Sequence, residues 1–482
     1  MKPTPTEREF AVEVVRRLRD AGHEALWAGG CVRDEWLGQA PKDYDVATSA
    51  LPEDVHRLFR RTVGVGEAFL VVEVLGPRTE AGPLKVQVAT FRSDGTYSGG
   101  RRPDSVTVST PREDAERRDF TINGMFFDPL GDRGIIDYVG GQEDLRRRVL
   151  RAIGDPVKRF TEDKLRLLRA VRMAARFELT IDPATADAIR AMAPGIGVVS
   201  AERVADEFRK MLVDRHRTRA MRLFVDLGLA APLLPELLPM VGLPQGLPRP
   251  DGPALPPPGM PAEPDHASVD LWEHVLRVLD RLGDGPSFPL AFAALLHDVG
   301  KPRTVGRTPE RYTFYGHEHV GRRMASEICL RLKTSNEERE RVEWLVEKHQ
   351  ILADVTRMRT SKLKTLLAHP GIRELLALHR ADALASGRAD DHVAYCERLL
   401  REWSAEDLNP PPLLTGHDLQ RGGLEPGPIY KRLLDAVREA QLEGTVKTPR
   451  EGRELVDRLL TADPSQPPAR GGEETSPLPN GP

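Results

Sequence analysis

The stretch that decides the fold is Ala28-Gly29-Gly30-Cys31-Val32-Arg33-Asp34, followed shortly by Asp43-Tyr44-Asp45. The residues before it predict a short strand that ends at Trp27, and a helix is expected to begin at about Cys31. Because glycine has no side chain, the backbone between strand and helix can approach a ligand closely. The free amides of a helix N-terminus favour an anion, and Arg33 adds a positive charge just inside the helix. This turn is therefore predicted to bind an anion.

Asp43 and Asp45 form the second part of the pattern. Residues i and i+2 of a strand point to the same face, so a strand here would hold two mutually repelling carboxylates together. A divalent cation relieves that repulsion, and a pair of Mg²⁺ ions is the usual arrangement for in-line phosphoryl displacement. A lone D-x-D pattern is common in solvated loops, but here it follows G-G-x-V-R-D. Asp43 and Asp45 are therefore predicted as catalytic residues that bind Mg²⁺.

Further motifs follow downstream, and the last one precedes an arginine-rich series. They are Ala89-Thr90-Phe91-Arg92, Gly100-Arg101-Arg102-Pro103-Asp104, Arg117-Arg118-Asp119-Phe120-Thr121-Ile122-Asn123-Gly124 and Glu162-Asp163-Lys164-Leu165-Arg166. Glu162, Arg166 and Arg169 are spaced to share one helix face. Asp163 and Arg166, about one turn apart, would offer acceptors and donors side by side. Two interpretations stay open for them: salt bridges within a helix, or recognition of a base edge.

In this order the motifs resemble those of the bacterial class II tRNA nucleotidyltransferases (CCA-adding enzymes) and the related bacterial poly(A) polymerases. The resemblance runs from about Trp27 to Leu212. It implies an α/β polymerase-β-like nucleotidyltransferase head followed by an all-α neck, body and tail. It also implies that Asp43 and Asp45 hold the catalytic Mg²⁺ ions, and that Ser200-Ala201-Glu202-Arg203 through Lys210 is the last neck motif.

The resemblance assigns further roles in nucleotide binding. Gly29, Gly30 and Arg33 would contact the triphosphate. Arg118 and Asp119 would position the nucleotide and recognise its ribose hydroxyls, and Asp163 and Arg166 would hydrogen-bond the incoming base in place of a template. The remaining residues assigned to nucleotide binding are Asn123 and Arg169.

One position departs from the family pattern: Gln87 stands before V-A-T-F-R where many relatives carry a glutamate. If its strand lies beside the one bearing Asp43 and Asp45, Gln87 is expected to face the metals.

Histidine and aspartate recur in a second, helical region. The residues are His274, His297, Asp298, His317, His349 and Asp382. Neutral imidazole with carboxylate suits Mn²⁺, Ni²⁺, Fe or Zn²⁺ better than Mg²⁺ alone, and such a metal can activate water against a phosphoester. The order H…HD…H…H…D resembles the HD phosphohydrolase superfamily. The resemblance leaves open whether this HD-type helical domain is a phosphohydrolase or only structural.

With 482 residues, the chain is expected to form about three units at roughly 100–200 residues per domain. Nine prolines between Pro244 and Pro264 exclude a helix or a central strand. The predicted divisions are a nucleotidyltransferase head (1–140), a helical neck and body for nucleotide selection and RNA binding (141–242), a proline-rich linker or loop (243–265), an HD-type metal-binding domain (266–400), a C-terminal helical tail (401–463) and a disordered tail (464–482).

Charge is segregated along the sequence. The formal net charge is only −3, which excludes a histone-like polycation, yet residues 141–220 hold 18 Lys/Arg against 12 Asp/Glu. Such an excess is typical either of solvated helix faces or of a track for a phosphate backbone.

Three widely spaced cysteines suit a reducing cytoplasm. No signal peptide and no apolar run of about 18 residues is evident, so a cytoplasmic location without a membrane partner is expected. No protein partner is predicted.

The leading hypothesis is a template-independent nucleotidyltransferase that adds CCA to the 3′ end of tRNA from CTP and ATP. A poly(A) polymerase and a CC-adding or A-adding specialist share these motifs and stay open, although a tail with Glu473 and Glu474 is not the basic arm that would favour poly(A) synthesis. Hypotheses from other classes are an HD phosphohydrolase with an RNA-binding head and a non-catalytic RNA-binding protein. Intact metal ligands in two regions argue against these last two.

Overall fold

The computed structural model describes residues 6–66, 70–80, 82–95, 105–245, 270–308 and 311–462. The chain divides into two compact units, Met1–Val342 and Glu343–Pro482. Three predicted segments lie outside the described residues: the motif at 100–104, the tail 464–482, and the proline-rich linker apart from residues 243–245. The domain boundaries given above stay predictions.

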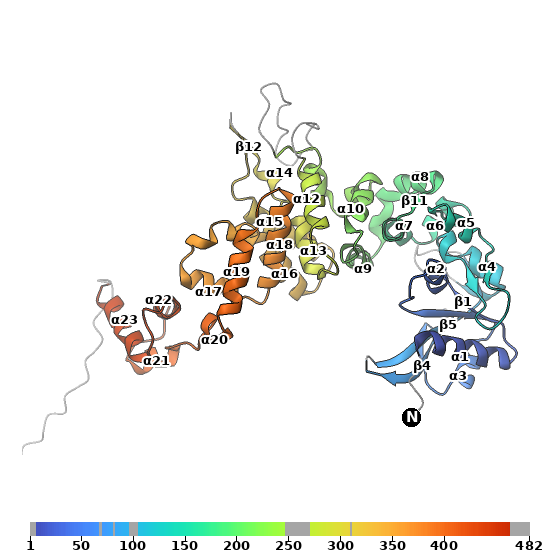
Figure 1. Ribbon diagram of the computed structural model, residues 1–482, viewed down its shortest axis with the longest axis horizontal. Coiled ribbons are helices and arrows are strands. Elements are labelled where there is room, and N and C mark those ends of the chain that lie inside the picture. Colours follow the sequence, from blue (N-terminus) through green and yellow to red (C-terminus); the bar gives the residue numbers. More distant parts are fainter. Residues whose placement is uncertain are drawn as a thin grey trace, which may run out of the picture. The chain divides into compact units, whose positions relative to one another are not determined.

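A mixed seven-stranded sheet forms the centre of the head (Figure 1). Its order is β3-β4-β5-β2-β1-β8-β9, with β2 and β5 parallel and the other neighbours antiparallel. The strands are β1 (Ala25–Ala28), β2 (Tyr44–Thr48), β3 (Thr62–Gly66), β4 (Val71–Thr79), β5 (Gly82–Thr90), β8 (Phe126–Phe127) and β9 (Ile135–Ile136). The predicted α/β head is confirmed. The sequence did not predict β3, β8 and β9, because glycine weakens the strand signal of β3 and two-residue strands are too short to show an alternation.

The two faces of this sheet differ in polarity. Valines at alternate positions of β2, β4 and β5 are buried on the face that α1 (Glu7–Asp20) and α3 (Pro52–Leu58) cover. A capping box between Thr6 and Glu9 begins α1. The intervening residues point to the other face, where Asp45, Gln87 and Glu73 lie in register on β2, β5 and β4. The polar face of the sheet is therefore the one opposite α1.

Helices dominate the rest of the first unit, as predicted. They are α2 (Gly30–Trp36), α4 (Pro111–Glu116), η2 (Thr121–Asn123), α5 (Gly141–Arg146), α6 (Pro156–Glu162), α7 (Leu165–Arg176), α8 (Pro183–Met192), η3 (Ala193–Val198), α9 (Ala201–Leu212), α10 (Arg217–Asp226), α11 (Ala230–Leu233), η4 (Pro235–Met240), α12 (Leu271–Asp280), α13 (Phe288–Leu296), α14 (Lys301–Thr304), α15 (His317–Arg331) and α16 (Asn336–Lys348). Short strand pairs β6–β7 (Arg92–Asp94, Val106–Val108), β10–β11 (Val149–Leu150, Thr180–Ile181) and β12–β13 (Gly306–Arg307, Tyr312–Thr313) join them.

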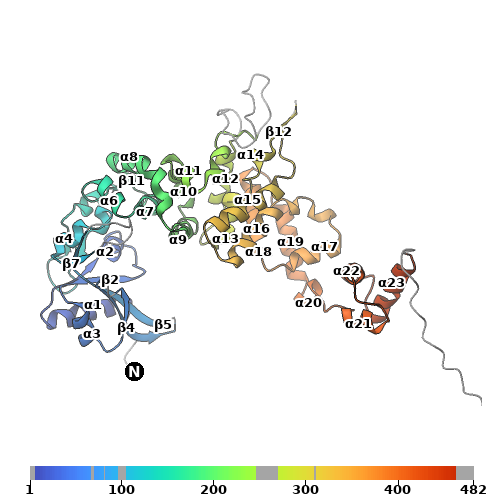
Figure 2. The ribbon, with the colours of Figure 1, turned by 180° about the vertical axis from the view of Figure 1, so that it is seen from behind.

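The proline-rich segment does not separate the helices on its two sides. Helix α10 packs against α7 and α12, and α9 packs against α7 and α13 (Figure 2). A hydrogen bond from Thr218 Oγ1 to the Leu276 carbonyl (3.4 Å) and an ion pair between Arg222 and Glu273 (2.6 Å) join α10 to α12. The neck and the first HD helices therefore form one continuous helical body.

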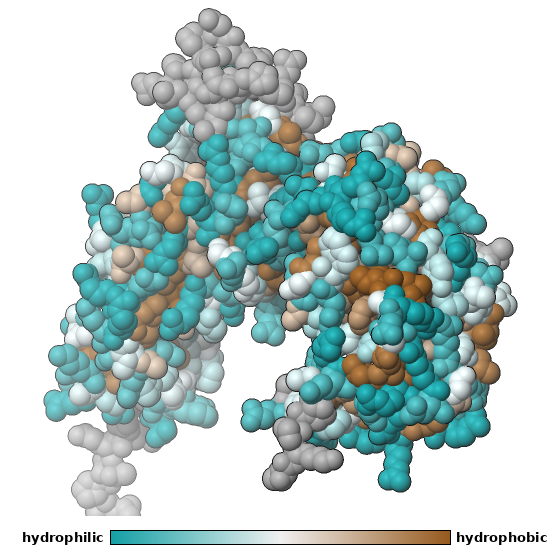
Figure 3. Space-filling model, turned by 45° about the vertical axis from the view of Figure 1, so that its right-hand side comes forward, coloured by the Kyte–Doolittle hydropathy of each residue, from teal (hydrophilic) through white to brown (hydrophobic). Residues whose placement is uncertain are grey.

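The second unit contains η5 (Ile351–Arg357) and helices α17 (Thr360–Leu367), α18 (Ile372–Ala385), α19 (Asp391–Glu402), α20 (Ala405–Leu408), α21 (Gly416–Arg421), α22 (Ile429–Glu443) and α23 (Pro449–Thr461). A small apolar core of Leu419, Leu433, Val437 and Val456 holds α21, α22 and α23 together. All three cysteines are free and buried. Hydrophilic side chains cover most of the face drawn in Figure 3. Among the described helices none has the length and apolar character needed to cross a bilayer.

Candidate active site

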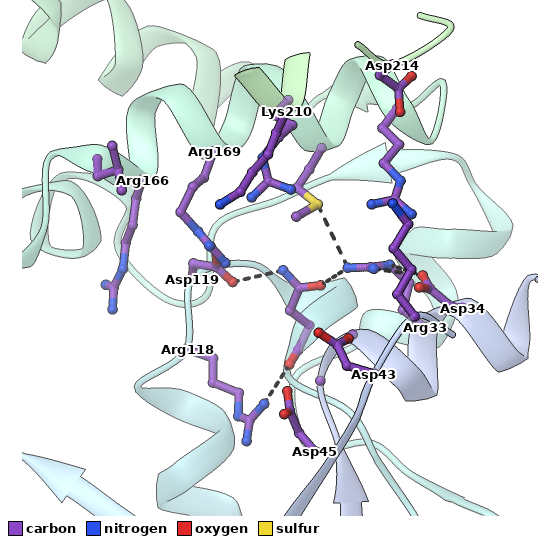
Figure 4. Close-up of a pocket in the computed structure, with 18 of the residues that line it drawn as sticks. Arg33, Asp34, Asp43, Asp45, Arg118, Asp119, Arg166, Arg169, Lys210 and Asp214 are labelled. Atoms are coloured by element: carbon purple, nitrogen blue, oxygen red, sulfur yellow. Dashed lines mark hydrogen bonds and ion pairs between the residues drawn. The ribbon is translucent and has the colours of Figure 1, made fainter. Parts of the chain in front are cut away.

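A cavity of about 990 Å³ lies between the polar face of the head sheet and helices α7 and α9 (Figure 4). It brings together every head and neck residue that the sequence predicted for the site. These are Gly29, Gly30, Arg33, Asp43, Asp45, Arg118, Asp119, Asn123, Asp163, Arg166 and Arg169. Because they come from segments more than 100 residues apart, their meeting in one cavity is a property of the tertiary structure.

The two acidic residues point into this cavity close to each other (Figure 4). Asp45 lies in β2, but Asp43 lies in the bend before the strand, so the prediction of one strand face is wrong for Asp43. Burial, and then the charge of Asp43, raise the pKa of Asp45 to about 6, while Arg118 lowers it. Neither carboxylate has a hydrogen bond or an ion pair within the described part of the chain. Paired, unneutralised carboxylates fit a divalent cation.

Gly29 allows an arginine to approach the turn. It has φ 74°, and a Cβ atom at this position would lie 2.7 Å from Arg118 Nη1. Arg118 Nη1 donates to the Asn123 carbonyl (3.3 Å), and its Nη2 lies 2.9 Å from Asp114 Oδ2. Asp114 is buried and also binds Arg117 Nη2 at 2.6 Å. Burial alone would raise the pKa of Asp114, but the guanidiniums of Arg118 and Arg117 lower it. Sequence reasoning missed Asp114, although it stands shortly before the R-R-D motif.

A hydrogen-bonded chain crosses the floor of the cavity. Arg169 donates to Asp119 Oδ2 through Nε (2.8 Å) and Nη2 (2.6 Å), and Asn123 Nδ2 donates to Asp119 Oδ1 (3.0 Å). The side-chain oxygen of Asn123, Oδ1, accepts a hydrogen bond from Arg33. The Arg33 guanidinium also donates to Asp34 (2.7 Å). Burial would raise the pKa of Asp119, but Arg169 and Asn123 hold it well below its usual range. These side chains are therefore oriented before any ligand binds.

The base-selection candidates have different partners from those predicted. The extended backbone of Asp163 ends α6, and its side chain accepts a hydrogen bond from the Leu165 amide at the start of α7. Glu162 and Arg166 therefore lie in different helices. Asp163 instead accepts from Arg203 of α9 at 2.6 and 3.2 Å.

Arg166 binds Glu162 Oε2 (2.7 Å) and the Arg117 carbonyl (3.2 Å). The salt bridge that the sequence left open therefore exists, and Arg166 still lines the cavity. Asp163 and Arg166 are thus held by separate partners, α9 and the R-R-D segment.

The cavity is rich in positive charge. Its lining contains eleven Lys/Arg and six Asp residues. Cations that motif reasoning did not single out for the site are Lys42, Arg117, Arg172, Arg176, Arg203, Lys210 and Arg215. Most come from residues 141–220, where the excess of basic residues and the neck motif that contains Arg203 and Lys210 were the signals that pointed to them. A cleft of this charge suits a polyanionic ligand such as a triphosphate or a phosphate backbone.

Gln87 occupies the position expected from its strand pattern. It is exposed and pairs in register with Asp45 on the adjacent parallel strand, which places both side chains on one face. It does not line the cavity itself. Glu73 is the residue opposite Gln87 on β4, and its carboxylate lies 3.2 Å from Lys85 Nζ. The functional role of Gln87 stays a prediction.

Three imidazoles surround the buried carboxylate of Asp298 in the first unit. His297 Nε2 and His274 Nε2 lie 3.1 and 3.7 Å from Asp298 Oδ2, and His317 Nε2 lies 3.3 Å from Oδ1. Lys301 Nζ also lies 2.7 Å from Oδ2. Burial would raise the pKa of Asp298, but His297 and Lys301 hold it well below its usual value. Lys301 was not among the residues predicted for this site.

The orientation of these rings fits a metal site. The Nδ1 atoms of His297 and His317 lie 2.8 and 2.7 Å from the carbonyls of Ala294 and Phe314. A carbonyl only accepts, so each Nδ1 donates and the neutral ring keeps its lone pair on the inward Nε2. Histidines that bind metals are usually oriented in this way.

The remaining HD candidates, His349 and Asp382, belong to the second unit. His349 repeats the pattern, with Nδ1 2.7 Å from the Val346 carbonyl. Asp382 accepts from Arg388 Nη2 at 3.2 Å. That His349 and Asp382 act as ligands stays a prediction.

Comparison with protein families finds three matches. The "Poly A polymerase head domain" matches residues 25–151, the "Probable RNA and SrmB- binding site of polymerase A" matches residues 178–240, and the HD domain matches residues 271–387. These matches confirm the predicted resemblance to the class II tRNA nucleotidyltransferase and poly(A) polymerase family with an HD domain. A nucleotidyltransferase head of this kind implies a divalent metal.

Curated relatives that match this chain are CCA-adding enzymes. The CCA-adding enzymes of Geobacillus stearothermophilus and Geobacillus kaustophilus are 41% and 42% identical over 232 and 244 residues. These alignments cover 48% and 50% of this chain but 55% and 58% of those proteins, so the chain spans little more than half the length of the curated relatives it matches.

Among solved structures, the Bacillus stearothermophilus CCA-adding enzyme in complex with CTP is similar with a TM-score of 0.68 at 27% identity, over 96% of this chain and 99% of that one. The Thermotoga maritima CCA-adding enzyme complexed with tRNA shares the fold, with a TM-score of 0.55 at 18% identity over 96% of each chain.

Proposed function

We propose that this protein adds CCA to the 3′ end of tRNA, without a nucleic-acid template, from CTP and ATP. The observation that carries the proposal is the single cavity in which Asp43 and Asp45 face the arginines of α7 and the R-R-D segment. Relatives that are CCA-adding enzymes, one of them solved with CTP, support it.

Asp43 and Asp45 would hold Mg²⁺, which supplies charge neutralisation at the reacting phosphates. The turn at Gly29 and Gly30 and the guanidinium of Arg118 line the place where the triphosphate would bind. Asn123 is fixed between Asp119 and Arg33, so its side chain and Asp119 are oriented to recognise a ribose. These groups bind and orient the substrate, which is most of what in-line phosphoryl transfer requires of a protein.

Base selection would lie with Asp163 and Arg166. Asp163 keeps lone pairs beyond those used by Arg203 and the Leu165 amide. Arg166 keeps N–H groups beyond those bound to Glu162 and to the carbonyls of Arg159 and Arg117. Each could therefore hydrogen-bond the edge of a base while its protein partner holds it still. A rigid donor and acceptor pair discriminates better than a mobile one, since a misplaced base leaves them unpaired.

The deciding experiment is incubation of tRNA that lacks its 3′ CCA with CTP alone, with ATP alone and with both. We expect CTP alone to give CC, ATP alone to give no extension, and both together to give CCA and then arrest. A long product with ATP alone would identify a poly(A) polymerase. Arrest at CC with both nucleotides would identify a CC-adding specialist, and extension only of tRNA that already ends in CC would identify an A-adding one.

Asp43→Ala or Asp45→Ala should abolish addition while tRNA binding persists, because phosphate contacts would come from the basic lining and not from the acidic pair. Binding is measured by filter retention or fluorescence anisotropy under the same salt conditions. Normal addition by either variant would remove these residues from the site.

We also propose that the HD domain is a metal-dependent phosphohydrolase. The three inward Nε2 atoms around Asp298 support this assignment, and their chemistry favours a transition ion such as Mn²⁺, Ni²⁺, Fe or Zn²⁺. Hydrolysis of bis(p-nitrophenyl) phosphate with each metal, in the parent and in His274→Ala, tests it. No metal-dependent hydrolysis in the parent would leave the domain a structural one.

A further inference from the structure

Helix α9 contacts the nucleotide cavity through one side. Arg203 holds Asp163, and Glu207 accepts from Arg172 Nε at 2.6 Å. Lys210, on the next turn, lines the cavity directly. Glu207 is buried, and so are Phe208 and Leu212. The position of α9 therefore determines where Asp163 and Arg172 lie.

The other side of α9 contacts helices that the HD match includes. Arg209 donates to both carboxylate oxygens of Glu338 on α16, through Nε at 3.0 Å and Nη2 at 2.8 Å. Its guanidinium also lies 5.2 Å from the centre of the Phe288 ring, at the start of α13. Helix α13 is the helix that ends directly before His297 and Asp298.

The C-terminal end of α9 is fixed to the same group of helices. Its last carbonyl, Leu212 O, accepts from Arg217 Nε at 2.9 Å. The buried Arg217 side chain also donates to the carbonyls of Leu279 (3.2 Å) and Gly283 (3.0 Å), at and just beyond the end of α12. Helix α9 is thus held between the nucleotide cavity and the HD helices.

We infer that the HD helices position the base-selection residues through α9, and that Arg209 and Glu338 are the positioning pair. The inference rests on the proposed nucleotide addition, but it does not require the HD site to be catalytic. Neither residue lines the cavity, so neither touches substrate. Their effect would reach the substrate only through α9, Arg203 and Asp163.

The geometry of this pair distinguishes it from an ordinary surface salt bridge. Exposed single-contact pairs contribute little to stability, because water screens the charges and two long side chains lose freedom. The Arg209 and Glu338 side chains are 31% and 21% exposed and make two parallel hydrogen bonds, with an aromatic ring beside the guanidinium. Displacements well below 1 Å at a selection site are enough to lower discrimination.

A matched control lies on the same helix. Lys333 Nζ binds Glu202 Oε1 at 2.9 Å, also joining α9 to the segment before α16, but these side chains are 64% and 57% exposed. Loss of this pair should have no measurable effect. It therefore separates the specific contribution of Arg209 and Glu338 from a general loss of charge near α9.

The test compares Arg209→Ala, Glu338→Ala and the control Lys333→Ala. The measured quantity is kcat/KM for CTP and ATP relative to UTP and GTP on tRNA that lacks CCA. We expect Arg209→Ala and Glu338→Ala each to reduce discrimination by about 3- to 10-fold, the range typical of residues that act through a packed element. Arg209→Lys, which keeps the charge but not both hydrogen bonds, should give an intermediate value. Lys333→Ala should match the parent.

A purely structural role would lower the amount of active protein, so it would reduce kcat for every nucleotide equally and leave the ratio unchanged. Unchanged discrimination in both alanine variants, or an equal loss in Lys333→Ala, would overturn the inference. A parent protein that adds no nucleotide would instead overturn the proposed function.

Discussion

Replacement of Asp45 by asparagine should stabilise the metal-free head while abolishing its catalysis. The carboxylate is partly buried beside Asp43, and this environment raises its pKa from 3.8 to about 6. Ionising Asp45 in the folded protein is therefore costly when no cation is bound. Asparagine has nearly the same shape and no charge, so the cost disappears in the variant while the ability to hold Mg²⁺ is lost.

The magnitude follows from the pKa difference of about two units, at ~1.36 kcal/mol per unit, and amounts to about 3 kcal/mol as an upper value. Solvent screening at this partly exposed side chain reduces it to roughly 1–3 kcal/mol.

Because the folded pKa is raised, the contribution of Asp45 to stability is fully present below the unfolded pKa of about 3.9. It is lost as the pH rises through about 6. The gain from Asp45→Asn should therefore be near zero at low pH and reach its full value above pH 7.

The assay is thermal unfolding of the parent and the variant in EDTA at a series of pH values. A gain of 1 kcal/mol corresponds to roughly 2–4 °C for a domain of about 150–250 residues. Asp43→Asn is the matched control: Asp43 is exposed, so its replacement should alter the metal-free melting temperature much less while also removing addition. Equal melting curves for Asp45→Asn and the parent at high pH, or a gain that does not depend on pH, would refute the reasoning.

Three further predictions concern selectivity, the metals and the second site. Arg166→Ala should weaken the preference for CTP and ATP over other nucleotides by roughly 5- to 150-fold, since one bidentate contact to a base contributes ~1–3 kcal/mol; an unchanged ratio of kcat/KM values would reduce Arg166 to a salt-bridge partner. Gln87→Glu should lower the Mg²⁺ concentration needed for half-maximal addition, because Gln87 pairs in register with Asp45; no change at limiting Mg²⁺ would mean that this side chain does not face the metals. His297→Ala/Asp298→Ala should lose a transition ion detectable by elemental analysis while nucleotide addition persists, and a folded double variant that cannot add nucleotides would contradict two independent sites.

Several site features could be predicted from the sequence because local rules determine them. The strand, glycine turn and helix around Gly29 follow from residue pattern and from the need for a positive φ, and the structure places them within a residue or two of their predicted limits. The HD residues His297 and Asp298 adjoin each other in the chain, so their meeting required no knowledge of the fold. The parallel pairing of β2 with β5 also gave Gln87 the face that alternation predicted.

Other features depend on contacts between distant segments. Arg203 binds Asp163 across the fold, and the neck motif that contains Arg203 gave no local reason to expect that contact. Residue spacing alone did not indicate that Asp163 would end one helix and cap the next, because a continuous helix was equally compatible with that spacing. The proline-rich segment suggested separate bodies, whereas packing of α9 and α10 against α12 and α13 makes them continuous.

By itself, the sequence determined the chemistry of this protein: two carboxylates after a glycine turn, an R-R-D segment, a basic helical region and an HD set. Only the tertiary structure decided which charges neutralise one another and which stay available to a ligand. In the part of the chain that the structure describes, Asp43 and Asp45 have no ion pair, whereas Asp119 and Asp163 are each bound by an arginine from a distant segment. The reason is physical, since a charge in a low-dielectric site is stabilised by partners within a few ångströms, and only folding brings Arg169 to Asp119 (50 positions apart in the chain) and Arg203 to Asp163 (40 positions apart) within that distance.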